Sequence, residues 1–530
     1  MTNPANKRKQ RLELTWIGKY DEIKLEPRIL IEDPEKSYGD PNSENMLIHG
    51  DNLLALKALE QDYAGKIKCI YIDPPYNTGK AFEHYDDCIE HSIWLNLMSY
   101  RLKILYKLLA KDGIIFINLD EAEHAYCKIV CDEIFGRNNY IGDLIWQKRK
   151  GGGNDSRFFA IDHDYVLVYA KSKDKAIHTK KWNVSQSSEY LKRYKEIDEN
   201  GFRYYWDTLA RDGLQNPILI EIQCPDGYIL KINSQKSTDT INDGLKKGNI
   251  RLIKGRNGWT LHHRVYMPDG QVLRSILNDV GTNKTAGDEL KALFGSAKSF
   301  DYPKPEGLIS RILELTTEKG DLVLDSFLGS GTTAAVAHKM GRKYIGIELG
   351  EHANTHCIPR LKAVVDGTDQ GGISKAANWQ GGGGFKFYNL APSLVKKDSF
   401  GQWIIDESYN ADMLAQAMCK HQGFKYSPNS EVYWKQGQST ETDFIFTTTN
   451  FVTLEMLEQL NSEMHEGESL LICAKSYAKE CEDRFPNITI KKIPQSILGK
   501  CEFGKDNYDL NLVETESIDD DLDFNDDENE

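Results

Sequence analysis

The sequence lacks the patterns that would assign it to several common protein classes. It has no P-loop signature, so nothing supports nucleotide hydrolysis at such a loop, and no HExxH or CxxC pair that would indicate a metal site. No stretch approaches the ~18 apolar residues of a membrane span, and residues 1–10 are polar and basic. We therefore expect a cytoplasmic protein without a metal centre or a membrane-spanning segment.

The ten cysteines run from Cys69 to Cys501 without paired spacing, which is typical of reduced thiols. Cys127 and Cys131 are one helical turn apart and are expected to share a buried face. A cluster at residues 352–357, with His352, His356 and Cys357, could ligate a metal, but ordinary helix residues are the preferred interpretation. At 530 residues, with 40% of them hydrophobic, the chain is long enough for two or three domains.

A short apolar strand leads directly into Asp73-Pro74-Pro75-Tyr76. The prolines fix φ and remove two backbone donors, so Asp73 and nearby carbonyls form a rim of acceptors with Tyr76 as a flat wall beside it. Such a rim suits the exocyclic amine of a nucleobase. The alternative is that a strand simply ends at a Pro-Pro turn.

A second pattern, at residues 322–348, predicts a strand, a glycine turn, a helix and another strand. Gly329 and Gly331 allow the backbone to approach a ligand closely, and the helix that follows begins with unpaired N–H groups. Glu348 ends the next strand, where a carboxylate can accept ribose hydroxyls. A nucleoside-bearing cofactor therefore fits. Ala334 replaces the third glycine of the dinucleotide fingerprint, so nicotinamide binding is not excluded.

Together these two patterns resemble the catalytic and cofactor motifs of amino-group DNA methyltransferases that use S-adenosylmethionine. Their order, with the catalytic motif first, resembles the permuted class called beta. The stretches at 50–57, 73–79, 118–121 and 300–305 are similar to the modification (Mod) subunits of type III restriction-modification systems. The resemblance covers roughly residues 45–350.

The resemblance implies methyl transfer to N6 of an adenine flipped out of double-stranded DNA. Asp73 and the Pro74 carbonyl would accept from the amine, and Tyr76 would stack on the base. The stretch at 301–305 would touch the amino acid end of the cofactor, unless it is an ordinary loop before a helix. The implied catalytic residues are Asp73, Pro74, Pro75 and Tyr76, and the implied cofactor residues are Asp51, Asp301, Lys304, Asp325, Phe327, Gly329, Gly331, Thr332 and Glu348.

Several alternatives stay open. Cytosine-N4 methylation has nearly the same chemistry, although its first motif position is commonly Ser, so Asp73 favours adenine. The absence of a Pro-Cys dipeptide counts against cytosine C5 methylation. A stand-alone adenine methyltransferase, an RNA or small-molecule methyltransferase and a catalytically silent DNA-binding module are further possibilities. A homodimer and a separate restriction (Res) subunit are the partners that the resemblance implies.

The net charge of −14 is unevenly distributed. Residues 514–530 hold ten acids and no Lys or Arg, whereas residues 146–300 hold 26 Lys and Arg against 18 Asp and Glu. The basic region, which includes Lys148-Arg149-Lys150, predicts DNA contacts, although a solvated turn is the rival interpretation for that tripeptide. The expected DNA-binding residues are Lys148, Arg149, Lys150, Arg193, Arg203, Lys254, Arg256 and Arg264.

Alternating strands and helices predict an α/β fold, a Rossmann-like, doubly wound and mostly parallel sheet with an inserted target-recognition domain and a small C-terminal α/β domain. Ligands would lie at the carboxyl ends of its strands. The expected segments are an N-terminal arm (1–45), the catalytic half of the core (46–174), a β-rich recognition domain (175–295), the cofactor half (296–366), a glycine-rich linker (367–390), the C-terminal domain (391–510) and an acidic disordered tail (511–530).

Overall fold

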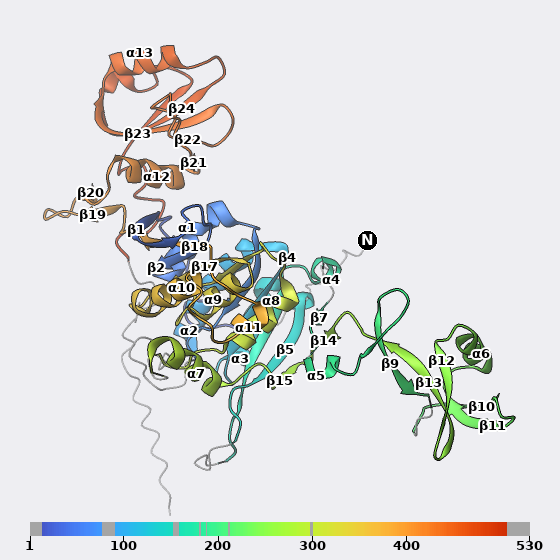
Figure 1. The fold of residues 1–530 in the computed structure, drawn as a ribbon. Coiled ribbons are helices and arrows are strands. Elements are labelled where there is room, and N and C mark those ends of the chain that lie inside the picture. Colours follow the sequence, from blue (N-terminus) through green and yellow to red (C-terminus); the bar gives the residue numbers. More distant parts are fainter. Residues whose placement is uncertain are drawn as a thin grey trace, which may run out of the picture. The chain divides into compact units, whose positions relative to one another are not determined.

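The chain folds into two compact units (Figure 1). Residues 182–273 form the smaller unit, and the chain before and after them forms the larger one. No helix in the described part is both long and apolar enough to cross a membrane. The computed structural model describes residues 13–76, 91–151, 158–179, 182–186, 188–209, 213–296 and 300–505, so the acidic segment 511–530 lies outside the described residues.

The larger unit is built on one ten-stranded sheet in the order β1-β18-β2-β17-β16-β3-β4-β6-β5-β15. From β18 to β4 neighbouring strands are parallel, whereas β6 is antiparallel to both β4 and β5. The predicted α/β class with a mostly parallel sheet is confirmed. The strands are β1 (Leu30–Gly39), β2 (Met46–His49), β3 (Ile67–Ile72), β4 (Leu109–Leu119), β5 (Tyr140–Gln147), β6 (His163–Ala170), β15 (Ile276–Leu277), β16 (Leu322–Asp325), β17 (Lys343–Glu348) and β18 (Gly384–Leu390).

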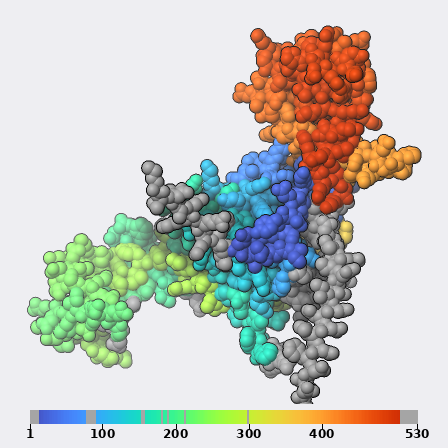
Figure 2. All heavy atoms as spheres, turned by 180° about the vertical axis from the view of Figure 1, so that it is seen from behind, coloured from blue at the N-terminus to red at the C-terminus, as the bar shows by residue number. Residues whose placement is uncertain are grey.

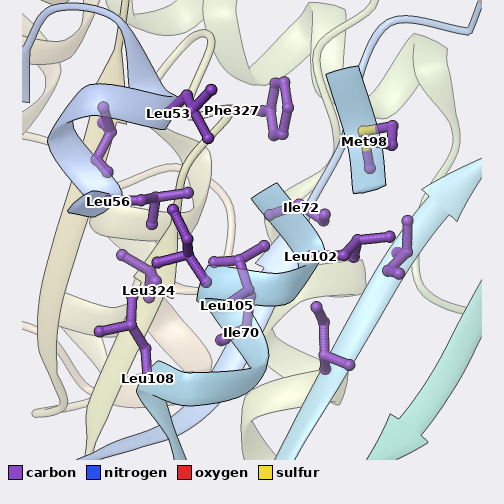
Figure 3. Packing of buried hydrophobic residues seen from close by; sticks show 14 of the residues in the cluster. Leu53, Leu56, Ile70, Ile72, Met98, Leu102, Leu105, Leu108, Leu324 and Phe327 are labelled. Carbon is purple, nitrogen blue, oxygen red and sulfur yellow. The ribbon is translucent and has the colours of Figure 1, made fainter. Parts of the chain in front are cut away.

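Helices cover both faces of this sheet because successive side chains of a buried strand point in opposite directions. Ile70 and Ile72 of β3 pack against α1 and α2, as Figure 3 shows for Leu53, Leu102 and Leu105. Cys69 points to the other face of the sheet, where its side chain is hydrogen-bonded to that of Thr316 on α8. The helices are α1 (Asn52–Tyr63), α2 (His91–Leu108), α3 (His124–Cys131), α7 (Asn283–Phe294), α8 (Glu306–Thr316), α9 (Thr332–Lys339) and α10 (Ile358–Val365).

The prediction of a glycine-rich linker at 367–390 is wrong for residues 384–390. These residues form β18, which lies inside the sheet between β2 and β1. Gly384 serves close packing, because a Cβ there would collide with the backbone of Asp40. The expected N-terminal arm likewise contains β1, the edge strand paired with β18.

The smaller unit is β-rich, as expected. Its main sheet has the order β12-β13-β9-β8, and α6 packs with β10 and β11 on a core of Ile220, Ile232 and Leu261. This unit is narrower than the range 175–295. The elements are β7 (Asn183–Val184), α5 (Ser188–Leu191), β8 (Glu196–Ile197), β9 (Arg203–Thr208), β10 (Ile218–Gln223), β11 (Ile229–Ser234), α6 (Thr238–Lys246), β12 (Ile250–Gly255), β13 (Gly258–Tyr266) and β14 (Gln271–Val272).

After β18 the chain forms a second, mixed sheet with the order β21-β22-β23-β24-β25. Its atoms, orange and red in Figure 2, gather into a compact body. This sheet and its helices agree with the small α/β domain expected in this part of the chain. The elements are β19 (Val395–Lys397), β20 (Trp403–Ile405), α12 (Ala411–Gln422), β21 (Lys425–Tyr426), β22 (Gly437–Gln438), β23 (Asp443–Val452), α13 (Leu454–Glu463), β24 (Ser469–Tyr477) and β25 (Ile488–Lys492).

Candidate active site

The two sequence motifs meet at one edge of the central sheet. Strands β3 and β16 are parallel neighbours, with Leu324 opposite Ile70, so Asp73 and Asp325 both lie at carboxyl ends. Asp325 is fully enclosed. Burial raises the pKa of Asp325 to about 7, and the charges of Asp73 and Glu348 add to this shift. A carboxyl group that titrates near neutrality is typical of a functional site, although buried structural groups show it too.

The Pro-Pro turn is held by a buried indole. Trp94 Nε1, on α2, donates to the Pro75 carbonyl at 2.7 Å, and Trp94 is completely buried. The Pro75 carbonyl is thereby occupied. Among the described residues no donor is bonded to the Pro74 carbonyl. Since proline supplies no N–H, the turn offers acceptors only.

The Asp73 carboxylate is surrounded by donors. The Tyr76 hydroxyl donates to Asp73 Oδ1 at 2.7 Å, and Asn118 Nδ2 donates to the same oxygen at 3.4 Å. Lys304 Nζ donates to the other oxygen, Oδ2. Lys304 is only 8% exposed and lies over the Tyr76 ring, 5.1 Å from its centre. Lys304, expected to contact the cofactor, therefore contacts the catalytic motif.

Tyr76 is enclosed by polar groups. Asn118 Nδ2 donates to its hydroxyl, and Asp164 Oδ2 lies 3.5 Å from that hydroxyl. Burial, then the charges of Asp164 and Asp73, raise the pKa of Tyr76 well above its usual value, so its hydroxyl stays protonated as a donor. Asp164 in turn binds Lys148 Nζ at 2.6 Å.

Lys148, for which we expect a contact with DNA phosphates, pairs its ammonium with Asp164, and 16% of its side chain is exposed. The sequence assigned no site role to Asp164, nor to Asn118 within the stretch 118–121. A polar residue near the end of the apolar strand β4 and a carboxylate at the start of the apolar strand β6 are the signals that point to them.

The glycine turn after β16 is tied to the end of β17. Gly329 N donates to Glu348 Oε2 at 2.7 Å, and Gly350 N donates to Glu348 Oε1 at 2.9 Å. Gly331, with φ of +81°, is the N-cap of α9. Gly329 has φ of +57°, a conformation that favours glycine, and a Cβ there would stand only 3.1 Å from the ring of Phe300.

Other expected cofactor residues have structural partners. Asp51 caps α1 by accepting from Leu54 N at 3.0 Å, and it lies 3.5 Å from Arg101. Phe327 packs in the hydrophobic core with Leu53 (Figure 3). Thr332 Oγ1 accepts from an arginine of α10, and Asp301 is exposed to solvent.

A buried network of charges supports the start of α9. Glu306 accepts from Lys339 at 2.9 Å and from Arg360 at 2.9 Å, and Lys339 also binds Asp369 at 2.7 Å. Arg360 further donates to Thr332 Oγ1 at 2.8 Å. These charges are all almost fully buried. Because each has a partner, the network fixes the glycine turn and α9 against α8 and α10.

The other residues expected to contact DNA differ in their partners and in their exposure. Lys254 is paired with Asp226 at 2.7 Å, and Arg264 with Glu199 at 3.7 Å. Arg193 lies over the Tyr190 ring at 4.2 Å. The remaining candidates, all exposed, are Arg149, Lys150, Arg203 and Arg256.

The cluster suspected of metal binding has other contacts. His352 and His356 pack on the ring of Phe300, with centroids 4.8 Å and 5.8 Å apart. Cys357 Sγ donates to Gly329 O at 3.2 Å, which ties α10 to the glycine turn. Cys127 and Cys131 are both buried, as expected.

The sequence profile of the family described as DNA methylase matches residues 67–357. The chain belongs to this family. Three curated relatives of this DNA methylase are Mod subunits of type III restriction-modification enzymes. The probable HindVI subunit of Haemophilus influenzae is 34% identical over 73% of this chain and 59% of its own. The StyLTI subunit of Salmonella typhimurium is 32% identical over 55% of this chain and 49% of its own. The EcoP15I subunit of Escherichia coli is 29% identical over 74% of this chain and 73% of its own.

The chain thus spans about half to three fifths of the first two of these relatives. A solved structure, a putative DNA modification methylase from Thermus thermophilus complexed with S-adenosyl-L-methionine, is 13% identical. The match covers 65% of this chain and 99% of that one, with a TM-score of 0.32.

Proposed function

We propose that this DNA methylase is a site-specific DNA methyltransferase that moves a methyl group from S-adenosylmethionine to N6 of adenine. The observation that carries the proposal is the acceptor group around Asp73, which lies next to the strand that bears the glycine turn. Family membership and the Mod subunits among its relatives favour the same reaction.

The adenine would leave the duplex, because its amine cannot be reached within the base stack. Asp73 and the Pro74 carbonyl would then accept its two N–H bonds, which localises the lone pair on the nitrogen. The Tyr76 ring would stack on the base. Lys304 would have to release Asp73 Oδ2 for a full contact. The nitrogen gains the methyl group and loses one proton, which the Asp73 carboxylate takes.

The residues at the glycine turn fit a nucleoside cofactor. The buried Ser326 Oγ, next to Asp325 at the end of β16, has no hydrogen-bond partner in the described part of the chain, which is the kind of polar atom that a bound ligand satisfies. The first turn of α9 offers N–H donors, and Glu348 offers acceptor oxygens. When bound, S-adenosylmethionine supplies a methyl group on a positively charged sulfur.

The relatives named above support a proposal about the complex in which this chain works. We propose that the chain is the modification subunit of a type III system, that it binds double-stranded DNA as a homodimer and that a separate restriction subunit joins it. We place it in the cytoplasm, which agrees with the nine free, buried cysteines among the described residues.

The test is to incubate the purified chain with duplex DNA and S-adenosylmethionine carrying a labelled methyl group. Digestion to nucleosides and mass spectrometry should find N6-methyladenine. Asp73→Asn should abolish transfer, whereas Asp174→Asn, an exposed carboxylate on the helix Lys173–Thr179, should leave it unchanged. N4-methylcytosine instead would establish the alternative base, and no methylated nucleoside from the wild type would refute the proposal.

A further inference from the structure

The sheet β12-β13-β9-β8 of the smaller unit has two unlike faces, since residues directly opposite on neighbouring strands share a face. Leu261 and Leu252 are cross-strand partners, and their face packs on β10, β11 and α6. The other face is polar and aromatic. It carries the cross-strand pairs Arg251 with His262, His262 with Thr208, Arg264 with Trp206 and Tyr266 with Tyr204.

Arg251 is the exposed cation of this polar face. Its guanidinium lies over the Trp206 ring, 4.0 Å from the centre. No carboxylate pairs with Arg251 among the described residues. Lysines elsewhere in the same unit are paired: Lys231 with Glu221 at 2.6 Å, Lys247 with Asp243 at 2.8 Å and Lys254 with Asp226 at 2.7 Å. A guanidinium held by stacking keeps its N–H donors available for a ligand.

The neighbours of Arg251 on the polar face have hydrogen-bonding side chains. The other arginine there, Arg264, is paired with Glu199 at 3.7 Å, and Trp206 Nε1 donates to Glu196 at 3.0 Å, so Arg251 is the arginine of this face with no carboxylate partner among the described residues. His262, directly opposite Arg251, donates to or accepts from Thr260 Oγ1 at 3.0 Å, and its Nδ1 is buried without a partner in the described chain. Burial, then the charge of Arg251, lowers the pKa of His262, which favours the neutral ring beside the arginine.

The shape fits the major groove of duplex DNA. Beyond their pairing with β9, strands β12 and β13 continue as an antiparallel ribbon that ends in a tight Gly255-to-Gly258 turn, and Arg251 lies at the base of this ribbon (Figure 1). A two-stranded ribbon can enter this groove, which is about 12 Å wide. Arginine is the side chain that reads a guanine there, by donating to its O6 and N7.

We propose that the polar face of β12 and β13 binds in the major groove and that Arg251 reads a guanine of the recognition site. This proposal rests on the proposed function only in taking duplex DNA as the substrate. Trp206 positions the guanidinium by stacking. Arg251 was not among the DNA contacts expected from the sequence, because the pattern of cations does not show which of them lack an acidic partner.

The experiment selects duplexes from a random-sequence DNA pool with the full-length chain and sequences the bound fraction. The wild type should enrich a motif that contains a guanine. Arg251→Ala and Arg251→Lys should each lower the preference for one guanine by roughly 5- to 150-fold and leave the other positions unchanged. Lys231→Ala, a cation of the same unit already paired with Glu221, is the matched control and should keep the full motif. Far-UV circular dichroism and thermal unfolding verify that each variant is folded.

Three results would overturn the inference. The first is a guanine preference that persists in Arg251→Ala. The second is a full preference in Arg251→Lys, which would indicate a contact with phosphate and not with a base. The third is RNA that competes for binding as well as duplex DNA does. Methylation of the same pool is scored separately. If the wild type enriches the motif but methylates nothing, the proposed transfer reaction fails while the reading by Arg251 stands.

Discussion

Lys304 and Asp73, 231 residues apart in the sequence, form an ion pair at the centre of the site. The same segment touches the glycine turn, where the Phe300 ring faces Gly329, and it continues into Glu306 of the buried charge network. Residues 300–306 therefore contact the Asp-Pro-Pro-Tyr motif, the glycine turn and α9. A substitution of Lys304 should first change the environment of the Asp73 carboxylate.

Replacing Lys304 by Met should destabilise the fold by about 1–3 kcal/mol, because the partly buried Asp73 carboxylate loses its cation. The free energy of unfolding in urea measures this. In the Lys304→Met, Asp73→Asn double variant the loss should be at least ~0.5 kcal/mol smaller than the sum of the two single losses. Strict additivity would show that the two side chains do not interact in solution.

Asn118→Ala should slow methyl transfer by roughly 10- to 100-fold, since a hydrogen bond to a charged group is worth about 1.5–3 kcal/mol. Asn118 donates to both the Tyr76 hydroxyl and Asp73. Binding of S-adenosylhomocysteine, measured by calorimetry, should not change. A loss of that binding equal to the loss of rate would mean that Asn118 supports the whole site and not the carboxylate alone.

Two substitutions separate the roles of Tyr76. Tyr76→Phe keeps the ring and removes the hydroxyl that donates to Asp73 at 2.7 Å. Tyr76→Ala also removes the stacking surface, and it should weaken capture of the base by a further ~1–3 kcal/mol. The rates of both variants on duplex DNA give the comparison. Equal rates would show that the ring does not stack on the target.

Asp325 should make the fold less stable as pH rises. Its folded pKa of about 7 lies above the ordinary 3.8, so the folded chain holds a proton that the unfolded chain has lost between about pH 4 and pH 7. The contribution of Asp325 to stability is therefore full below pH 4 and falls up to pH 7. Urea unfolding of the wild type and Asp325→Asn should show a difference that changes over this range. A difference independent of pH would contradict the prediction.

The sequence predicts where the two motifs lie in the fold, because each position depends only on neighbouring residues. A strand followed by Asp-Pro-Pro-Tyr, and a strand followed by glycines, place Asp73 and Asp325 at carboxyl ends whatever the rest of the chain does. Contacts between side chains of distant segments could not be predicted in this way. Nothing in the residues at 118, 164 and 304 shows that they converge on one tyrosine, since that depends on the packing of β4, β6 and the segment before α8.

The error at 367–390 has a physical cause as well. Glycines occur both in flexible linkers and where two backbones approach closely, and the sequence alone does not distinguish the two. Gly384 is of the second kind, because the backbone of Asp40 occupies the space of its missing side chain. The same limit applies to Arg251, whose lack of an acidic partner is visible only in three dimensions.

The buried pair of Lys339 and Asp369 bears on where this chain can be shortened. A fragment that ended at residue 366 would contain both motifs, yet it would remove Asp369, one of the two carboxylates that pair with the buried Lys339, and would uncover the edge of β2. The smallest fragment that folds should therefore extend through β18 to Leu390 and begin before Leu30, so that β1 can pair with it.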